Sequence, residues 1–538
     1  MTRTERWTLL AAILGSGIVF LDGTIVNLAL PSIGRLPSSF LGVLEGQAYV
    51  QSGYLAVLSA LLILAGALAD IYGRRKVFAI GLAGFGVSSL LCGIAPSLEL
   101  IVLFRILQGA SGALLVPGSL SIITATFDGA ARSRAFGTWA ASTSGLALFG
   151  QPIGGLLVDS LSWRAAFLIN VPLLALALWA TLRHMRESRD SDADRHLDWL
   201  GAAVGAIAIG GLAFGATRGQ QLEWRDTLAW VALGVGAVAL VIFPLLMLRR
   251  PHPLVPLELF RNREFAVINL STFLIYGALY VGGFYQSVLL QATLGYTATA
   301  ASLSGFPTGL LLVVLSPRVG ALAGRLGPKP FLVAGPLIMA VGLLWWARIP
   351  ATSEAWRASL ADPSTLLPPL SVLIDVLPAL LIFGVGIGLV VAPLTTMLMG
   401  SIPTRHAGLG SAINNALSRV GSPLIGAVVF IIVSATFYSA LSTHVPALDT
   451  SNPVVRAQYP PLNPPNGDVS LDVAQAAKEA SVDAFRVAAI LAAVLLVSGS
   501  AANMVGLRGT PARPDRARSE RLSGRRTKET DRAVGRGP

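Results

Sequence analysis

Apolar stretches of about twenty residues dominate the chain, and short polar segments separate them. A helix needs about 20 mostly apolar residues to cross a hydrocarbon core of about 30 Å, and by this criterion we expect about fourteen spans. These runs lack the strict alternation of a barrel strand, so they predict an all-α membrane protein. The expected limits are 7–28, 47–69, 77–95, 100–122, 135–157, 164–183, 199–217, 228–248, 265–290, 300–322, 331–350, 371–397, 407–436 and 485–506.

Two motifs occur twice along the chain. Gly66-Ala-Leu-Ala69 is repeated as Gly320-Ala-Leu-Ala323, and Gly150-Gln-Pro152 is echoed by Gly421-Ser-Pro423. Duplicated halves with a binding site between them are common in secondary transporters. We therefore expect an N-terminal six-helix bundle at 1–183, linkers with two inserted central spans at 184–264, a C-terminal six-helix bundle at 265–507, and a tail at 508–538.

Composition and charge exclude most other classes of protein. Of 538 residues, 54% are hydrophobic and only 13% are charged, which cannot cover the surface of a soluble enzyme, a disordered chain or a nucleic-acid reader. Neither the single cysteine nor the five scattered histidines suggest a disulfide or a metal site. We expect no cofactor, no metal and no nucleic-acid partner.

The positions of lysine and arginine predict the orientation, because cytoplasmic loops retain them. An even number of spans with both termini cytoplasmic places most of the 40 basic residues inside. The tail from Arg508 is basic and poor in apolar residues, so we expect disorder there and contact with anionic lipid. The long proline-rich outer loop at 437–484 is expected to end in a short amphipathic helix on the outer face, Asp472 to Asp483.

Asp22 and Arg105 are charged residues within predicted spans. Asp22 lies roughly 22 Å along the first span from Trp7, counting about 1.5 Å per residue. A charge at that depth costs on the order of 2.5–3.5 kcal/mol, which favours the neutral acid and suits proton exchange. A structural carboxylate bonded to a neighbouring helix is the alternative.

Arg105 shares one face of its helix with Gln108, Gly109 and Gly112, which predicts a polar stripe directed into the bundle. The guanidinium needs acceptors there and is expected either to tune proton affinity or to clamp helices together. Arg419, beside Asn414 and Asn415, is a comparable candidate in the second half.

Glycines mark two further motifs. Gly66, Asp70 and Gly73, followed by Arg74 and Arg75, predict tight turns and a charged latch that holds the outward-open state. A topogenic cluster would explain only the basic residues. The second motif comprises Gly145, Gly150, Pro152, Gly154 and Gly155. Its small residues predict close helix packing between the halves, and its proline predicts a bend.

The ordered set of motifs resembles the fourteen-span drug:proton antiporter branch of the major facilitator superfamily. The resemblance covers nearly all of residues 1–507. It rests on Leu21-Asp22-Gly-Thr24 through Asn27 and Pro31, Gly66 through Lys76, Arg105-Ile-Leu-Gln108-Gly109, Gly145 with Gly150 through Gly155, and Trp163-Arg164 through Asn170-Val-Pro172. It implies the major-facilitator fold of two six-helix bundles plus two extra spans.

The resemblance implies a proton-coupled exporter in the cell membrane that works by alternating access, with Asp22 and Arg105 in coupling. The expected cavity lining of Asn27, Gln108, Gln151, Asn414 and Arg419 has few formal charges, which suits neutral amphipathic compounds or delocalised cations. We expect a monomer. The alternatives are a dedicated exporter of one metabolite, siderophore, peptide or lipid, inward proton symport, and, remotely, a membrane enzyme using Asp22 and Asp375.

Overall fold

The computed structural model describes residues 1–508 except 128, 189–197, 223, 252, 256, 360 and 402–406, and leaves some helical side chains, including those of Asp70 and Gln151, undescribed. The basic tail therefore lies outside the described residues, apart from Arg508. Within them the regular structure is helical, and the one β-bridge joins Ser359 and Asp362.

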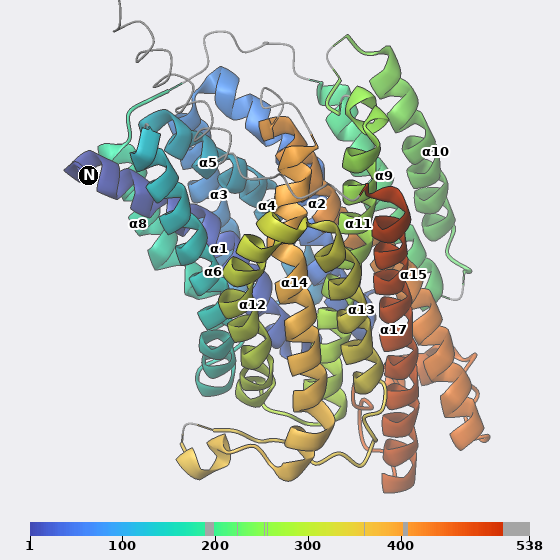
Figure 1. Ribbon diagram of the computed structural model, residues 1–538. Coiled ribbons are helices and arrows are strands. Elements are labelled where there is room, and N and C mark those ends of the chain that lie inside the picture. The colour runs from blue at the N-terminus through green and yellow to red at the C-terminus, as the bar shows by residue number, and fades with distance from the viewer. Residues whose placement is uncertain are drawn as a thin grey trace, which may run out of the picture.

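Most of the α-helices follow one another with short connections, and the longer ones lie between α13 and α14 and between α15 and α17 (Figure 1). In chain order they are α1 (Arg3–Ile33), α2 (Val43–Tyr72), α3 (Arg74–Ile94), α4 (Leu98–Ala113), α5 (Leu115–Thr126), α6 (Gly129–Ser160), α7 (Ala165–Leu168), α8 (Asn170–His184), α9 (Trp199–Gln221), α10 (Thr227–Arg249), α11 (Arg263–Val288), α12 (Ala298–Leu326), α13 (Lys329–Trp346), α14 (Leu377–Gly400), α15 (Ala407–His444), α16 (Pro453–Gln458) and α17 (Leu471–Gly506). Short 3₁₀ or π turns lie at Leu257–Arg261, Leu289–Thr293, Pro363–Leu366 and Val372–Val376.

Twelve helical segments within the described residues are long and apolar enough to cross a membrane. Each predicted span corresponds to a helix or to consecutive helices. The predicted span 100–122 is interrupted at Leu114, between α4 and α5, and the predicted span 164–183 is divided between α7 and α8.

Residues Asp472 to Asp483 are helical, as predicted, but they do not form a short helix of their own. This segment forms the first turns of α17, which continues unbroken to Gly506. No proline or glycine interrupts the chain between Asp472 and Phe485, and Ala476, Ala480 and Ala484 are buried against neighbouring helices. The first turns of α17 are therefore helical because they pack on the rest of the protein.

The sequence repeat has a structural counterpart. Gly73 ends α2 with a φ of 106°, and Gly327 ends α12 with a φ of 83°, a left-handed conformation that favours glycine at both sites. In addition, a Cβ at Gly150 of α6 would meet Leu21 of α1, and one at Gly421 of α15 would meet backbone atoms of α11. Corresponding helices of the two repeats thus make corresponding contacts.

Helices α1–α8, here the N-terminal half, pack largely on one another, as do α11–α17, here the C-terminal half. The two halves meet mainly where α2 packs on α15 and α6 packs on α12, with α1 touching α11 between these seams. The pair α9 and α10 stands at one side of the bundle (Figure 1), and α9 contacts both α2 and α15. The inserted pair therefore covers one of the two seams.

Candidate functional site

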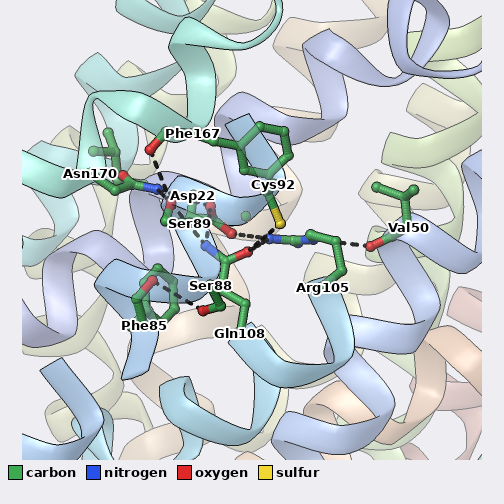
Figure 2. Close-up of polar contacts among 12 residues, drawn as sticks. Asp22, Val50, Phe85, Ser88, Ser89, Cys92, Arg105, Gln108, Phe167 and Asn170 are labelled. Carbon is green, nitrogen blue, oxygen red and sulfur yellow. Dashed lines mark hydrogen bonds and ion pairs between the residues drawn. The ribbon is translucent and has the colours of Figure 1, made fainter. Parts of the chain in front are cut away.

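Asp22 lies at the centre of a fully buried polar cluster in the N-terminal half (Figure 2). Its Oδ2 accepts a hydrogen bond from Arg105 Nη1 in an ion pair, and both side chains are 0% exposed. Its Oδ1 accepts from Gln108 Nε2 at 3.1 Å and from Asn170 Nδ2 at 3.1 Å. The acid is thus a paired and hydrogen-bonded group, not an isolated one.

Arg105 joins three helices. Besides Asp22 of α1, it donates from Nε to the carbonyl oxygen of Val50 in α2 at 3.1 Å, and its guanidinium lies 4.0 Å from the ring centroid of Tyr54. Its Nη1 also donates to Gln108 Oε1 at 2.7 Å. A buried guanidinium needs such acceptors, and one nitrogen, Nη2, has none within the described residues.

The predicted polar stripe of α4 is confirmed as a buried face. Arg105, Gln108, Gly109 and Gly112 are all buried. A Cβ at Gly109 would come within 2.4 Å of the carbonyl oxygen of Tyr54, so glycine is required for α4 to approach the α2 backbone this closely. That approach brings Arg105 to the Val50 carbonyl.

Asn170 and Ser89 complete the cluster and were absent from the predicted site. Asn170 Nδ2 and Gln108 Nε2 donate to Ser89 Oγ at 3.1 and 3.3 Å, and Ser89 donates to the carbonyl oxygen of Phe167 at 2.9 Å. Asn170 does fall within the motif that begins at Trp163, which was the available signal. Ser89 carried none, because single serines are ordinary in membrane helices.

The motif from Gly66 to Lys76, which spans the end of α2 and the start of α3, contacts the end of α8 and the residues that follow it. Arg75 and Lys76 donate their backbone N–H groups to the two carboxylate oxygens of Glu187 at 3.0 and 3.2 Å, which caps the start of α3. The Arg75 guanidinium also donates to the Leu182 carbonyl, and the Arg74 N–H to Ser188. Glu187 was missed by the sequence prediction, and the predicted partner Asp70 has no described side chain.

The second glycine motif, Gly145 with Gly150 through Gly155, contacts two different interfaces. A Cβ at Gly154 would meet Ile25 of α1 at 2.8 Å, and Gly150 likewise faces α1, so the prediction of packing between the halves is wrong for these two glycines. Gly155 does lie between the halves, because a Cβ there would be 2.6 Å from the Ala298 carbonyl oxygen of α12. Gly145 faces open space, and Pro152 lies within the continuous helix α6.

The expected cavity residues do not form one group. Gln108 belongs to the Asp22 cluster, and Asn414 donates to Asn269 Oδ1 and Thr272 Oγ1 of α11 at 3.1 and 2.8 Å. Asn27 donates to its own helix at Gly23 and accepts, through its carbonyl oxygen, from Ser287 of α11. Arg419 lies between the halves, with its guanidinium 5.6 Å from the Phe20 ring. The side chain of Gln151 lies outside the described residues.

Several contacts join the halves at the end of the bundle where α1 ends and α2 begins. Gln47 and Asn463 exchange side-chain hydrogen bonds of 3.0 and 3.2 Å, and both are buried. The Asp159 carboxylate at the end of α6 accepts from the Ala298 and Thr299 N–H groups that begin α12, at 3.1 and 2.6 Å. The two halves are thus held together at this end.

A segment of the long loop takes part in that closure. Residues 459–463 are buried in succession, although they belong to the connection between α15 and α17. Leu462 is 0% exposed and has a φ of 57°, and its carbonyl oxygen accepts from Thr293 Oγ1 at 2.8 Å. We call residues 459–463 the plug segment.

Comparison with known families gives one match that covers most of the chain. The family model described as Major Facilitator Superfamily matches residues 12–427. The match includes Asp22, Ser89, Arg105, Gln108 and Asn170 of the cluster, and it ends within α15. The expected family is confirmed.

Two curated relatives have names that refer to drug resistance. One is the multidrug resistance protein Stp of Mycobacterium tuberculosis (strain CDC 1551 / Oshkosh), which is 32% identical over 512 residues and covers 92% of this chain and 91% of the relative. The other is the puromycin resistance protein pur8 of Streptomyces alboniger, 32% identical over 428 residues, which covers 78% of this chain and 80% of the relative.

A solved structure shares the fold. The crystal structure of a bacterial homologue of the human lysosomal transporter Spinster, in an inward-facing and unoccupied conformation, aligns with a TM-score of 0.63 at 18% identity. The alignment covers 95% of this chain and all of that chain. At this identity the likeness concerns the fold alone.

Proposed function

This chain belongs to the Major Facilitator Superfamily, and from that membership we propose that it is a proton-coupled exporter of amphipathic small molecules. Its family and its relatives make it a transporter and not an enzyme. In this proposal the protein exchanges external protons for internal substrate by alternating access between its two halves. The proton gradient supplies about 1.4 kcal/mol per pH unit for each proton moved.

The observation that carries the proposal is the ion pair between Asp22 and Arg105. Ionisable residues inside membrane segments are expensive, and they mark proton or substrate pathways by default. Here the carboxylate is fully buried, receives three donors from α4 and α8, and is the one carboxylate that pairs with a guanidinium in the middle of the described helices. A proton arriving on Asp22 would remove the charge that holds Arg105.

Arg105 connects the proposed proton site at Asp22 to the contact between the two halves. When Asp22 is neutral, Arg105 keeps the Val50 carbonyl and the Tyr54 ring of α2 as its remaining partners, together with Gln108. Because α2 packs directly on α15, a change in the hold of Arg105 on α2 acts at the junction of the halves. In this proposal that change biases the bundles toward the other orientation.

Contacts between the halves support alternating access. The amide pair of Gln47 and Asn463, the plug segment and the bond of Asp159 to α12 close one end of the bundle. The proposed orientation makes that end external, so the structure corresponds to the state closed to the outside. Substrate release outward then requires these contacts to part.

The proposed topology has fourteen spans with both termini in the cytoplasm. Twelve spans are found within the described residues, and α2 and α6, which include undescribed side chains, are long enough to supply two more. The divisions at 1–183, 184–264 and 265–507 belong to the proposal, as do a cell-membrane location, a monomeric state and contact of the basic 508–538 tail with anionic lipid.

The experiment that tests the proposal compares the parent protein with Asp22→Asn in proteoliposomes. Transport of a fluorescent amphipathic substrate against its gradient, driven only by an imposed pH difference, is expected for the parent and lost in the variant. The gating roles proposed for Gly66, Asp70, Gly73, Arg74 and Arg75 are secondary to this test.

A dedicated exporter is the second candidate, because one relative is named for resistance to a single compound, puromycin. Transport of several unrelated dyes by the purified protein favours the multidrug function, whereas one strict substrate favours the dedicated exporter.

A further inference from the structure

Arg419 has no charged partner at the middle of the protein. It lies on α15, only 6% of its surface is exposed, and among the described residues no carboxylate or carbonyl oxygen hydrogen-bonds to it. Among the described residues, the Arg419 guanidinium makes a cation–π contact with the Phe20 ring of α1, across the junction of the halves. A buried guanidinium ordinarily has acceptors, so its five N–H donors call for a ligand.

Aromatic side chains and further donors surround this position. Arg419 lies within electrostatic reach of Tyr54 on α2 and Tyr276 on α11, and Tyr54 is likewise within reach of Arg105. The hydroxyl of Tyr54 and the Nη2 of Arg105 are both buried without a hydrogen-bond partner. Because these two atoms have no accessible surface, Arg419, which is 6% exposed, is the donor that a ligand can reach here.

The charge balance of the region is positive. Asp22 neutralises Arg105, but within the described residues nothing neutralises Arg419, so the centre carries one excess positive charge. Such a charge is costly at membrane depth, and a ligand that brings acceptor oxygens offsets the cost. A permanently cationic ligand would add to it.

Partly exposed aromatic side chains lie on the helices that meet at this position. Phe20, Tyr276 and Tyr280 each retain exposed surface, although they lie on α1 and α11, which face one another across the halves. Tyr276 and Tyr280 lie with their ring centroids 6.5 Å apart. The aromatic ring of a ligand can stack on these side chains, while the Arg419 guanidinium binds the oxygens of its carboxylate.

We propose that Arg419, beside Phe20 at the junction of the halves, forms a subsite that binds the carboxylate of aromatic acids, so that the protein selects acidic aromatic compounds over cationic ones. This inference rests on the proposed export function and names its substrate class. It differs from the substrate expected from sequence, which included delocalised cations, because the sequence does not reveal that Arg419 lacks a partner.

The test is equilibrium binding to the purified full-length protein in lipid nanodiscs, without any pH gradient. Three probes share one aromatic body: pyrenebutyrate, its neutral amide pyrenebutyramide, and a pyrenebutyl trimethylammonium. The parent is expected to bind the carboxylate at least about tenfold more tightly than the ammonium, as one charge-assisted interaction allows. Equal or tighter binding of the ammonium would overturn the proposal.

Variants then assign the preference to Arg419. Arg419→Gln is expected to weaken carboxylate binding about tenfold or more and to leave amide binding within about threefold, which also reports that the variant is folded. Arg419→Lys keeps the positive charge but loses the planar guanidinium, so its carboxylate affinity should lie between those of the parent and Arg419→Gln. Arg318→Gln, an exposed arginine of α12, is the control and should change nothing.

Unchanged carboxylate affinity in both Arg419 variants would also overturn the proposal. Because no gradient is used, the result is independent of proton coupling. If the parent protein shows no preference for the carboxylate probe but transports substrate in response to a pH difference, only this inference is refuted. If it prefers the carboxylate probe but its transport does not depend on the pH difference, only the proposed proton coupling is refuted.

Discussion

Arg105 and Asp22 form an ion pair between α4 and α1 in which neither side chain has any exposed surface. The same arginine also donates to the Val50 carbonyl of α2 at 3.1 Å. One guanidinium thus links the proposed proton site to a helix that packs on the other half of the protein. The arrangement gives the pair two separable roles, in stability and in coupling, and each can be measured.

Removing one member of the pair should destabilise the protein strongly. Arg105→Gln leaves Asp22 buried without its cation, which is expected to cost about 3–5 kcal/mol of the free energy of unfolding. The double variant Asp22→Asn with Arg105→Gln should recover part of this loss, because no unpaired charge remains. Unfolding in mixed detergent micelles measures both.

The pair of Arg486 and Asp483, whose side chains are 43% and 38% exposed, is the control. Arg486→Gln should cost no more than about 1 kcal/mol, since solvent screens that pair. Equal losses at the two sites, or a double variant at Asp22 and Arg105 as unstable as the single one, would contradict the account.

A methyl group at Gly155 should disturb the junction of the halves. In Gly155→Ala the new Cβ would lie 2.6 Å from the Ala298 carbonyl oxygen and 2.9 Å from Thr299 Cα, both in the backbone of α12. Because backbone cannot yield as a side chain can, the state in which Gln47 and Asn463 are in contact should become less populated. Thiol labelling of Asn463→Cys from the outside, in a chain with Cys92→Ala, is expected to rise.

Gly145→Ala provides the comparison for that experiment. It lies on the same helix, and a Cβ there would meet nothing within 4 Å. Its labelling rate should match that of the parent. If the two alanine variants label alike, close packing at Gly155 does not govern closure.

Fixing the plug segment should stop the transport cycle. Cysteines at Gln47 and Asn463, in the Cys92→Ala background, can be joined by a short bifunctional methanethiosulfonate because the native side chains are in direct contact. Transport should fall to the background rate when the link forms and return when a reductant breaks it. Each single-cysteine variant, treated in the same way, is the control.

Continued transport by a chain that mass spectrometry shows to be fully linked would mean that the contact between positions 47 and 463 does not part during the cycle. It would remove the plug segment from the mechanism while leaving the Asp22 cluster untouched.

The sequence predicted the helices and part of the cluster for a common physical reason. Apolar runs long enough to cross a membrane are rare elsewhere, and so are charges within them, which made Asp22 and Arg105 conspicuous. Helical spacing then placed Gln108 and Gly109 on the face of Arg105. These inferences need only the period of one helix.

What the sequence did not predict depends on which helices meet. Asn170 and the Val50 carbonyl reach the cluster through packing of α8 and α2, and a backbone carbonyl carries no sequence signal. Gly154 and Gly155 are neighbours with the same local pattern, yet they face α1 and α12 respectively. The missing partner of Arg419 is likewise a property of the whole assembly.

The most direct test of the central claim is efflux driven by an imposed pH difference of one unit, measured in proteoliposomes for the parent, Asp22→Asn and the control Asp226→Asn. We predict that the parent and Asp226→Asn concentrate the substrate, while Asp22→Asn loses gradient-driven movement by at least about tenfold but still exchanges substrate down its own gradient. Full gradient-driven transport by Asp22→Asn would contradict the role proposed for the buried pair.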